Sequence, residues 1–394
     1  MKLLYISRLN VLSPKAHVYN TLHTLEALAG ELGITAHLIT IFKKVPTDSL
    51  HELVYKPNGV NPKFNLTQLT PWGYNLGLSR SLLVRILGTV LDNIRLSWYL
   101  LWHVREYEVV YARDHLLWLT WAFARFVLRK PCFFESHFVL TKQYSQWCAE
   151  FCIKYATGAI TIARALENFY SKFQKNITTI FCAAAEPERF APFVNQSKSE
   201  LRVTLNLPQD ATILGYSGNL YQTGNGDSYG IEDIIAALPL LPKNVIFVGI
   251  GKRDDAPPTL DTVIKQHGVE NRVLLVPWIP KSEVAQYLLA SDILLIPAAG
   301  AKPGNSPTKV FEYLISERPI IAANTEPIAE VLTDRKTALL VDYKKPEAWQ
   351  RAIEEVVNNK ALESELVKNA SIAGKEFSWS GRAKQIIAFI KAHT

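Results

Sequence analysis

This sequence has few of the residues that mark a secreted or disulfide-built protein. Only four of its 394 residues are cysteine, and no Cys-x-x-Cys pair occurs among Cys132, Cys148, Cys152 and Cys182. This scarcity favours reduced, buried thiols in a reducing compartment over a disulfide framework. The first apolar run is too short for a signal peptide, so we expect a buried strand there and a cytoplasmic protein.

Apolar runs free of charge are also missing. A membrane-spanning helix needs ~20 residues nearly free of charge, and the richest apolar run, residues 81–105, does not provide them. Its interruptions are Arg85, Asp92, Arg95 and His103. We therefore expect no membrane span. Two interpretations of the run stay open: amphipathic core helices, or a helical surface that lies on a membrane or holds an apolar acceptor.

No run of Lys and Arg and no RNA-binding motif occurs, so we expect no nucleic-acid partner. The net charge is nevertheless +7, and it is uneven. Residues 1–200 hold 22 Lys and Arg against 14 Asp and Glu, whereas the remainder holds 21 against 22. The basic N-terminal half favours an anionic partner, such as a phosphorylated acceptor or the inner face of an acidic membrane with peripheral association.

Short β-rich runs alternate with longer helical patterns along the chain. In the N-terminal half we expect strands at residues 3–7, 36–42, 108–112, 131–136, 158–162 and 177–182. A polar stretch, residues 195–200, breaks the pattern and predicts a linker near residues 192–205. Further strands are expected at residues 212–217, 245–249, 272–276, 292–297, 319–323 and 338–341. Strands separated by helices indicate parallel sheets, so we predict two doubly wound α/β domains with a ligand cleft between them.

The segment after the expected strand at 292–297 has the features of a phosphate site. Ser306 is a good N-cap, and Pro307 fits the first helical position. A helix start presents free N–H groups and a partial positive charge, which favour phosphate. Lys309 lies in the first turn, where a cation is unfavourable unless an anion lies beside it. Glu312 shares that face and could accept hydrogen bonds from a ribose, although an ordinary exposed Lys-x-x-Glu pair explains the spacing equally well.

A set of motifs in fixed order surrounds this segment. The strongest is Ser306-Pro307-x-Lys309-x-x-Glu312-Tyr313, followed by Arg318-Pro319-Ile320-Ile321-Ala322. Other matching segments lie at residues 215–220, 229–233, 247–251, 276–280, 290–297 and 377–379, and looser ones at 15–18, 110–114 and 134–137. Together they resemble glycosyltransferase family 4 over nearly the whole chain.

The resemblance implies a GT-B fold with two facing Rossmann-like domains around a deep interdomain cleft. Residues 1–195 would bind the acceptor, residues 196–376 would bind the nucleotide sugar, and a last helix at 377–394 would cross back to the first domain. The implied activity is retaining, metal-independent transfer of a hexose-type sugar from a UDP- or GDP-sugar to a lipid-linked or polysaccharide acceptor. No other cofactor is expected.

The resemblance also implies roles for individual residues. Lys309, Glu312 and His137 would act in catalysis. The donor-binding residues would be Gly218, Asn219, Gly251, Trp278, Ile279, Gly304, Asn305, Ser306, Pro307 and Thr308. The acceptor-binding residues would be Lys15, His17 and Arg113.

Three positions depart from the family pattern. Gly304 stands where Glu is common, Asn219 where Arg is common, and Tyr229 where a Lys precedes Gly230. These departures keep open a non-catalytic GT-B protein that binds a nucleotide or a glycan as a partner subunit. A sugar-nucleotide epimerase ranks lower, because the sequence shows no clear acid–base pair for the sugar.

Overall fold

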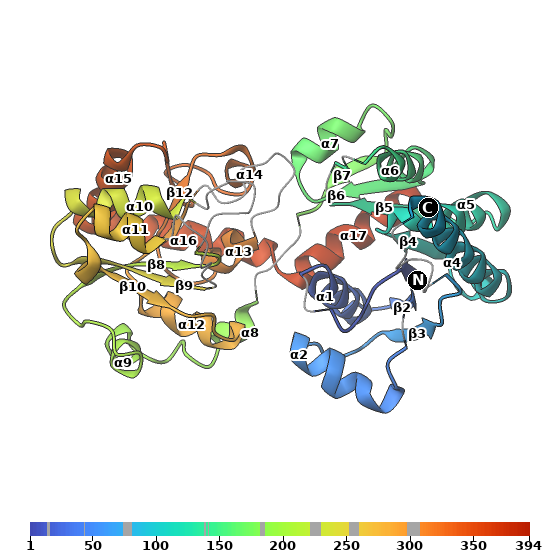
Figure 1. The fold of residues 1–394 in the computed structure, drawn as a ribbon, viewed down its shortest axis with the longest axis horizontal. Coiled ribbons are helices and arrows are strands. Elements are labelled where there is room, and N and C mark those ends of the chain that lie inside the picture. Colours follow the sequence, from blue (N-terminus) through green and yellow to red (C-terminus); the bar gives the residue numbers. More distant parts are fainter. Residues whose placement is uncertain are drawn as a thin grey trace. The chain divides into compact units, whose positions relative to one another are not determined.

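The computed structural model describes residues 1–13, 16–42, 44–73, 81–137, 139–140, 142–181, 186–220, 230–251, 260–297 and 308–394. The chain divides into two compact units (Figure 1). Unit 1 comprises Met1–Cys182 and Trp379–Thr394, and unit 2 comprises Ala183–Ser378. Each unit contains a parallel β-sheet between helices, so the predicted α/β class with two doubly wound domains is confirmed.

The sheet of unit 1 has seven parallel strands within the described residues, in the order β3-β2-β1-β4-β5-β6-β7. Their bounds are β1 Lys2–Ser7, β2 Thr35–Ile41, β3 Asn65–Leu69, β4 Val109–Ala112, β5 Cys132–Ser136, β6 Gly158–Thr161 and β7 Ile177–Thr179. The order reverses beside β1, which pairs with both β2 and β4. Loops after β1, β4 and β5 therefore emerge next to each other at the carboxyl edge of the sheet.

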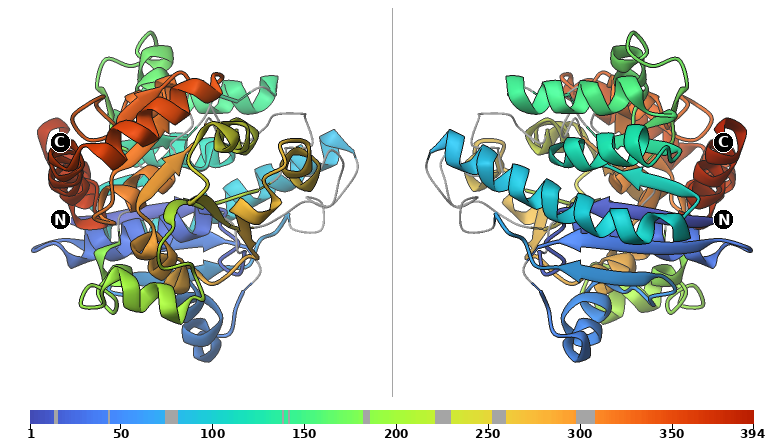
Figure 2. Two further views of the ribbon diagram at one scale, coloured as in Figure 1. Left: turned by 90° about the vertical axis from the view of Figure 1, so that its left-hand side faces the viewer. Right: turned by 90° about the vertical axis from the view of Figure 1, so that its right-hand side faces the viewer.

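Helices cover both faces of this sheet because β1 is apolar on both sides. Leu3 and Tyr5 face one core, and Leu4 and Ile6 face the other. The first core is closed by α1 (Ala16–Gly30) and α17 (Trp379–His393), and the second by α4 (Leu82–His103), α5 (Trp118–Ala122) and α6 (Gln143–Tyr155). Figure 2 shows α4 lying across the sheet. The remaining helical segments of unit 1 are η1 Thr47–Ser49, η2 His51–Tyr55, α2 Lys56–Asn58, η3 Val104–Glu106, η4 His115–Leu117, η5 Phe123–Val127 and α7 Arg164–Tyr170.

Unit 2 repeats the plan with six parallel strands among its described residues, in the order β10-β9-β8-β11-β12-β13. The strands are β8 Thr212–Ser217, β9 Val245–Ile250, β10 Val273–Val276, β11 Ile293–Ile296, β12 Ile320–Ala323 and β13 Leu339–Val341. The helical segments are α8 Pro187–Phe190, α9 Lys198–Thr204, α10 Ile231–Ala237, η6 Leu238–Leu240, α11 Leu260–Gln266, η7 Glu270–Arg272, α12 Lys281–Ala290, α13 Thr308–Leu314, α14 Glu326–Ala329, α15 Pro346–Asn358 and α16 Lys360–Glu376.

The chain divides at different residues from those we expected. The polar stretch that suggested a linker leads into α9, whose N-terminus is closed by a reciprocal capping box between Ser197 and Glu200. The division falls at 182/183 instead of 195/196, because α8 packs against α12 of unit 2. The second division falls at 378/379, two residues after the expected end of the second domain, and α17 packs against α1 of unit 1.

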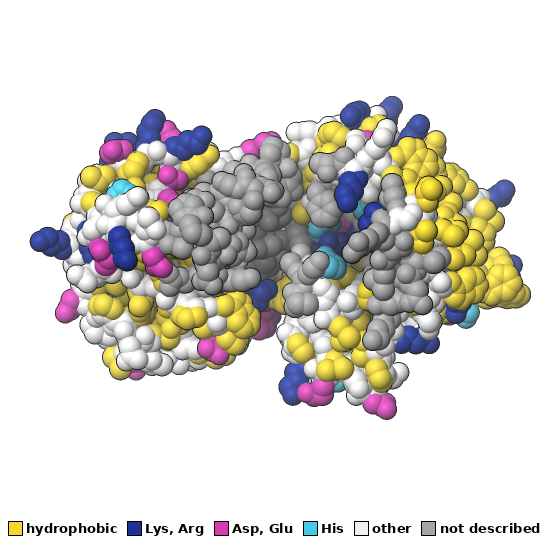
Figure 3. Space-filling model, viewed as in Figure 1, with side chains coloured by type: hydrophobic (Ala, Val, Ile, Leu, Met, Phe, Trp, Pro, Cys, Tyr) yellow, Lys and Arg dark blue, Asp and Glu magenta, His cyan; other side chains and the backbone are white. Residues whose placement is uncertain are grey.

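The surface of unit 1 carries a concentration of apolar side chains. Figure 3 shows them gathered at the end of the unit where Figure 1 places α4 and α5. None of the described helices combines the length and the apolar character that crossing a bilayer requires.

Candidate active site

Two glycines hold the strand ends of the proposed donor site in unit 2 close together. Gly218 follows β8 with φ 146°, and Gly251 follows β9 with φ 153°. The Gly218 amide donates to the Ile250 carbonyl at 2.8 Å. A β-carbon on Gly251 would lie 1.7 Å from the Gly218 carbonyl oxygen, so no other residue fits without a shift. The two strand ends are therefore held in backbone contact at the carboxyl edge of the sheet, where sheets of this kind bind ligands.

Lys309 extends from α13 to the end of β8. Its Nζ donates to the Tyr216 hydroxyl at 2.8 Å and lies 4.1 Å from the centroid of the same ring. Burial lowers the pKa of Lys309 to about 7, against the opposing effect of Glu312. No acidic side chain in the described part of the chain lies within ion-pair distance of Lys309. The neighbours of the amine are therefore the ring and the hydroxyl of Tyr216. An anion bound beside the amine would stabilise its positive charge.

Glu312 is engaged by a residue that the sequence did not reveal. Its Oε1 pairs with Arg189 of α8, and both side chains are 15% exposed. Arg189 also pairs with Glu186 at 3.5 Å and donates to the Lys281 carbonyl. A ribose that donates hydrogen bonds to Glu312 would therefore bind a carboxylate whose rotamers are already limited by the Arg189 guanidinium.

Some of the other predicted donor residues lie in the described part of the chain, and some do not. Trp278 and Ile279 lie between β10 and α12, where Trp278 is 71% exposed and Ile279 is partly exposed. Asn219 follows Gly218, and its carbonyl accepts a hydrogen bond from the Tyr216 hydroxyl at 2.9 Å. These residues share the carboxyl edge with Lys309. Thr308 is the first residue of α13. The predicted Gly304, Asn305, Ser306 and Pro307 lie outside the described residues.

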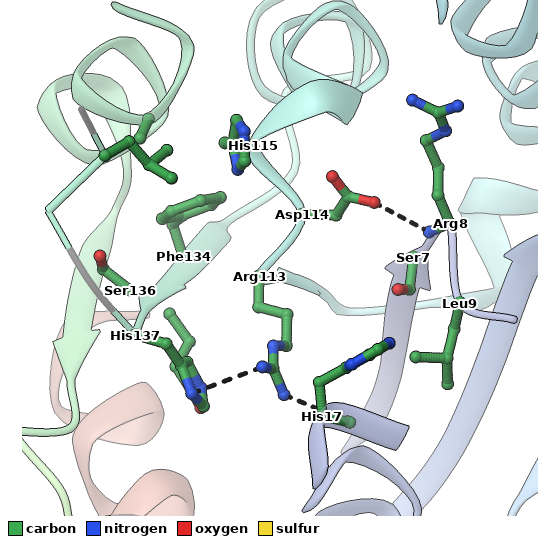
Figure 4. Close-up of a pocket in the computed structure, with 13 residues that line it drawn as sticks. Ser7, Arg8, Leu9, His17, Arg113, Asp114, His115, Phe134, Ser136 and His137 are labelled. Carbon is green, nitrogen blue, oxygen red and sulfur yellow. Dashed lines mark hydrogen bonds and ion pairs between the residues drawn. The ribbon is translucent and has the colours of Figure 1, made fainter. Parts of the chain in front are cut away.

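Unit 1 contains a pocket of about 290 Å³ at the carboxyl ends of β1, β4 and β5 (Figure 4). It brings three predicted residues together: His17 from α1, Arg113 after β4, and His137 after β5. Arg113 donates to the His17 carbonyl at 3.4 Å and to Thr21 at 3.3 Å. These contacts are long, and none of them is to a carboxylate. Lys15, the fourth predicted residue of this group, lies outside the described residues.

A buried carboxylate organises His137. Glu135, 4% exposed, faces His137 Nε2 and accepts from the Tyr111 hydroxyl and, at 2.7 Å, from Arg382 Nη2. Burial alone raises the pKa of Glu135, but the charge of Arg382 holds the pKa well below its usual range. Arg113 Nη2 lies 3.4 Å from His137 Nδ1. Because a guanidinium only donates, Nδ1 accepts and the proton is assigned to Nε2, toward Glu135.

The imidazole of His137 is neutral in this setting. Burial, reinforced by Arg113, lowers the pKa of His137 to about 4 although Glu135 opposes the shift. Both ring nitrogens are engaged, Nε2 by Glu135 and Nδ1 by the long contact from Arg113. A sugar hydroxyl would have to displace Arg113 to reach Nδ1, and the neutral ring supplies no positive charge at neutral pH.

Comparison with known proteins finds a family model that matches part of the chain. Residues 197–373 match the model of the glycosyl transferases group 1. That segment contains the strand ends described above, Lys309 and Glu312. A "D-inositol 3-phosphate glycosyltransferase" of Corynebacterium urealyticum is 22% identical over 232 residues, which are 58% of this chain and 54% of that relative. The chain spans about half the length of the curated relatives it matches.

Solved structures resemble the chain over both units. The Anabaena protein Alr3699/HepE, solved in complex with UDP, gives a TM-score of 0.72 at 17% identity, with both chains covered completely. The lipopolysaccharide outer core galactosyltransferase WaaB gives 0.68 at 16% identity, again over both complete chains. The predicted GT-B fold is confirmed by these likenesses.

Sequence reasoning missed four residues that organise the two groups of candidate site residues, one in each unit. These are Tyr111 and Arg382 in unit 1 and Arg189 and Tyr216 in unit 2. The available signals were weak: a Glu-x-His spacing at a strand end, and an Arg on the apolar face of the last helix. Their partners lie far away in sequence, 247 residues for Arg382 and Glu135 and 123 for Arg189 and Glu312.

Proposed function

We propose that this protein is a retaining, metal-independent glycosyltransferase. It moves a hexose-type sugar from a nucleotide-diphosphate sugar, with UDP or GDP as the nucleotide, to a lipid-linked or polysaccharide acceptor. It needs no cofactor besides the donor, and it works on the cytoplasmic side of a membrane. Support comes from the match to the glycosyl transferases group 1 and from the likeness to a structure solved with UDP.

The observation that carries the proposal is the amine of Lys309. Glycosyl transfer leaves negative charge on the departing diphosphate, and that charge must be stabilised. The Lys309 amine reaches from α13 to the end of β8, is largely desolvated, and has no described carboxylate within ion-pair distance. A cation in such a dry, preorganised place is worth ~3–4 kcal/mol of transition-state stabilisation. Glu312, held by Arg189, would position the nucleotide or the sugar through its hydroxyls.

His137 is proposed to act from unit 1 without exchanging a proton. A sugar hydroxyl that displaces the 3.4 Å contact from Arg113 would donate to Nδ1 of this neutral ring. Retention then needs no protein nucleophile if the leaving phosphate takes the acceptor proton. Arg113, His17 and Lys15 are proposed to hold the acceptor, with Arg113 suited to an anionic group.

A donor screen tests this function. The full-length protein is incubated with labelled UDP-, GDP- and ADP-sugars, and nucleotide release and new glycosidic product are measured. We expect turnover with one nucleotide class and a loss of about 100-fold or more in Lys309→Met, with Glu312→Gln also strongly impaired. Lys360→Met, which removes an exposed lysine paired with Glu363, serves as the matched control.

The same screen separates the alternatives. Nucleotide binding without release would favour the non-catalytic partner protein that the departures at Gly304, Asn219 and Tyr229 keep open. Interconversion of the donor sugar without nucleotide release would favour an epimerase. Wild-type turnover in both Lys309→Met and Glu312→Gln would show that the donor site is wrongly assigned.

A further inference from the structure

The outward face of α4 is apolar over its whole length. Six of its side chains are 43–78% exposed, and their spacing of 4, 7, 4, 3 and 1 residues places them on one side of the helix. They are Leu83, Leu87, Ile94, Trp98, Leu101 and Trp102. The opposite side is buried: Leu96 and Leu100 lie in the core, together with the polar Thr89, Asp92 and Asn93. A surface helix of a water-soluble protein normally presents polar residues outward, so this face is built to be covered.

Neighbouring segments extend the same surface. Phe126 and Val127 of η5 are 52% and 63% exposed, and Trp147 and Tyr155 of α6 are 48% and 39% exposed. The ring of Phe126 lies 5.6 Å from the ring of Tyr155, which joins η5 to α6. We call the ten side chains from α4, η5 and α6 the apolar face. Figure 3 shows hydrophobic side chains gathered at this end of unit 1, and exposed apolar clusters of this kind mark interaction surfaces.

Basic side chains adjoin this face. Arg125 donates through Nε to the Tyr155 carbonyl, and Lys154 lies 5.3 Å from the Tyr155 ring centroid. Arg95 of α4 lies over the ring of exposed Trp72, 5.5 Å from its centroid. None of the three forms an ion pair with an acidic side chain in the described ranges. Apolar and tryptophan side chains surrounded by unpaired cations match the interface of an anionic bilayer, where indoles lie at the headgroup level and cations contact phosphates.

We propose that the apolar face is the surface through which this protein lies on an anionic lipid bilayer. α4 rests parallel to the membrane with Trp98 and Trp102 in the interfacial layer, over about 33 Å of helix at 1.5 Å per residue. Arg125, Lys154 and Arg95 contact lipid phosphates at its border. The inference deepens the proposed function, since it names the surface and the partner for a transferase that meets a lipid-linked acceptor.

Vesicle flotation tests the surface. The full-length protein is mixed with vesicles of phosphatidylcholine alone or with one third phosphatidylglycerol, at low and high salt. We expect binding to the anionic vesicles, weakened by salt, with a blue shift of tryptophan emission. The double variant Trp98→Gln/Trp102→Gln should bind at least about tenfold more weakly. The control Val203→Gln/Ile372→Gln, which removes two exposed apolar side chains from unit 2, should bind like the wild type.

Two measurements distinguish membrane binding through the apolar face from a failure of the proposed function and from self-association. Donor turnover in solution with a soluble acceptor should be unchanged in Trp98→Gln/Trp102→Gln. If the wild-type protein shows no turnover but still binds vesicles, only the proposed function is contradicted. Sedimentation velocity without lipid tests self-association. A dimer that this variant converts to monomer, without vesicle binding by the wild type, would overturn the proposal and assign the face to a second copy of the chain.

Discussion

At the scale of single residues, Lys309 links charge, pH and ligand. In the free protein its pKa is about 7, whereas an amine beside a diphosphate is favoured in its charged form and has a higher pKa. Donor binding above pH 7 therefore takes up a proton. We expect the dissociation constant for UDP or GDP to rise about tenfold per pH unit above pH 7. Below pH 7, where Lys309 is already charged, the titration of this group should leave the constant unchanged. Calorimetric titrations from pH 6 to 9 measure this.

Lys309 variants provide the control for that profile. Lys309→Arg keeps its charge at every pH tested, so nucleotide binding by this variant should lose its pH dependence above pH 7.

The stability of the nucleotide-free protein should change with pH in the opposite direction to nucleotide binding. The depressed folded-state pKa means that the unfolded chain holds more protons between pH 7 and the ordinary value of 10.5, so stability rises with pH there. Lys309→Met should raise the melting temperature at pH 7; a lower one would contradict the desolvation of the amine.

At the scale of elements, α17 belongs to unit 1 and holds the buried carboxylate of Glu135 through Arg382. Arg382, 2% exposed, donates to the Ile180 carbonyl at 2.8 Å and to the Phe181 carbonyl at 2.9 Å, in addition to Glu135 on β5. Arg382→Met would leave Glu135 buried without its strongest counter-charge. We expect a loss of about 3–5 kcal/mol at pH 7, measured by urea unfolding. Arg335→Met, which breaks an exposed pair with Glu355, should cost no more than about 1 kcal/mol.

The pH dependence of these stabilities identifies the cause. In the wild type the depressed pKa of Glu135 contributes stability that is present above the ordinary value of 4.5 and lost as the pH falls through the folded-state pKa. In Arg382→Met, burial dominates and raises that pKa, so Glu135 protonates and the deficit against the wild type shrinks toward pH 4. Adding Glu135→Gln should recover part of the stability at pH 7. A deficit that stays constant with pH would mean lost packing and no charge effect.

Most elements could be predicted because each is specified by its own residues. Every strand we expected is present, since buried parallel strands are nearly continuous runs of apolar residues. The exception, β3, was missed because Asn-Leu-Thr-Gln-Leu is half polar and lies at the edge of the sheet, with one buried residue. Spacing alone related only site residues that are local, as for Lys309 and Glu312 on one helix, whereas His17, Arg113 and His137 were expected from the resemblance. Their partners Tyr216 and Arg189 come from other elements, and no periodicity encodes such contacts.

At the scale of the whole molecule, α17 belongs to a different unit from the residues that directly precede it. Ligand binding stabilises the groups that contact the ligand, by ~2.7 kcal/mol at a hundredfold excess over the dissociation constant. If the nucleotide binds unit 2, the amides of residues 212–220, 245–251 and 308–314 should exchange more slowly with UDP or GDP. Residues 379–393 should exchange as before, because α17 is packed against α1 of unit 1.

Hydrogen exchange measured by mass spectrometry on the full-length chain follows both units at once. Lys309→Met should lose the nucleotide-dependent protection at all three segments of unit 2, since they converge at one edge of the sheet. Arg382→Met should instead speed exchange in α17 and β5 together while it leaves the nucleotide response of unit 2 intact. Nucleotide protection confined to the strand ends around Arg113 and His137 would place the donor in unit 1, and the roles assigned to the two units would have to be exchanged.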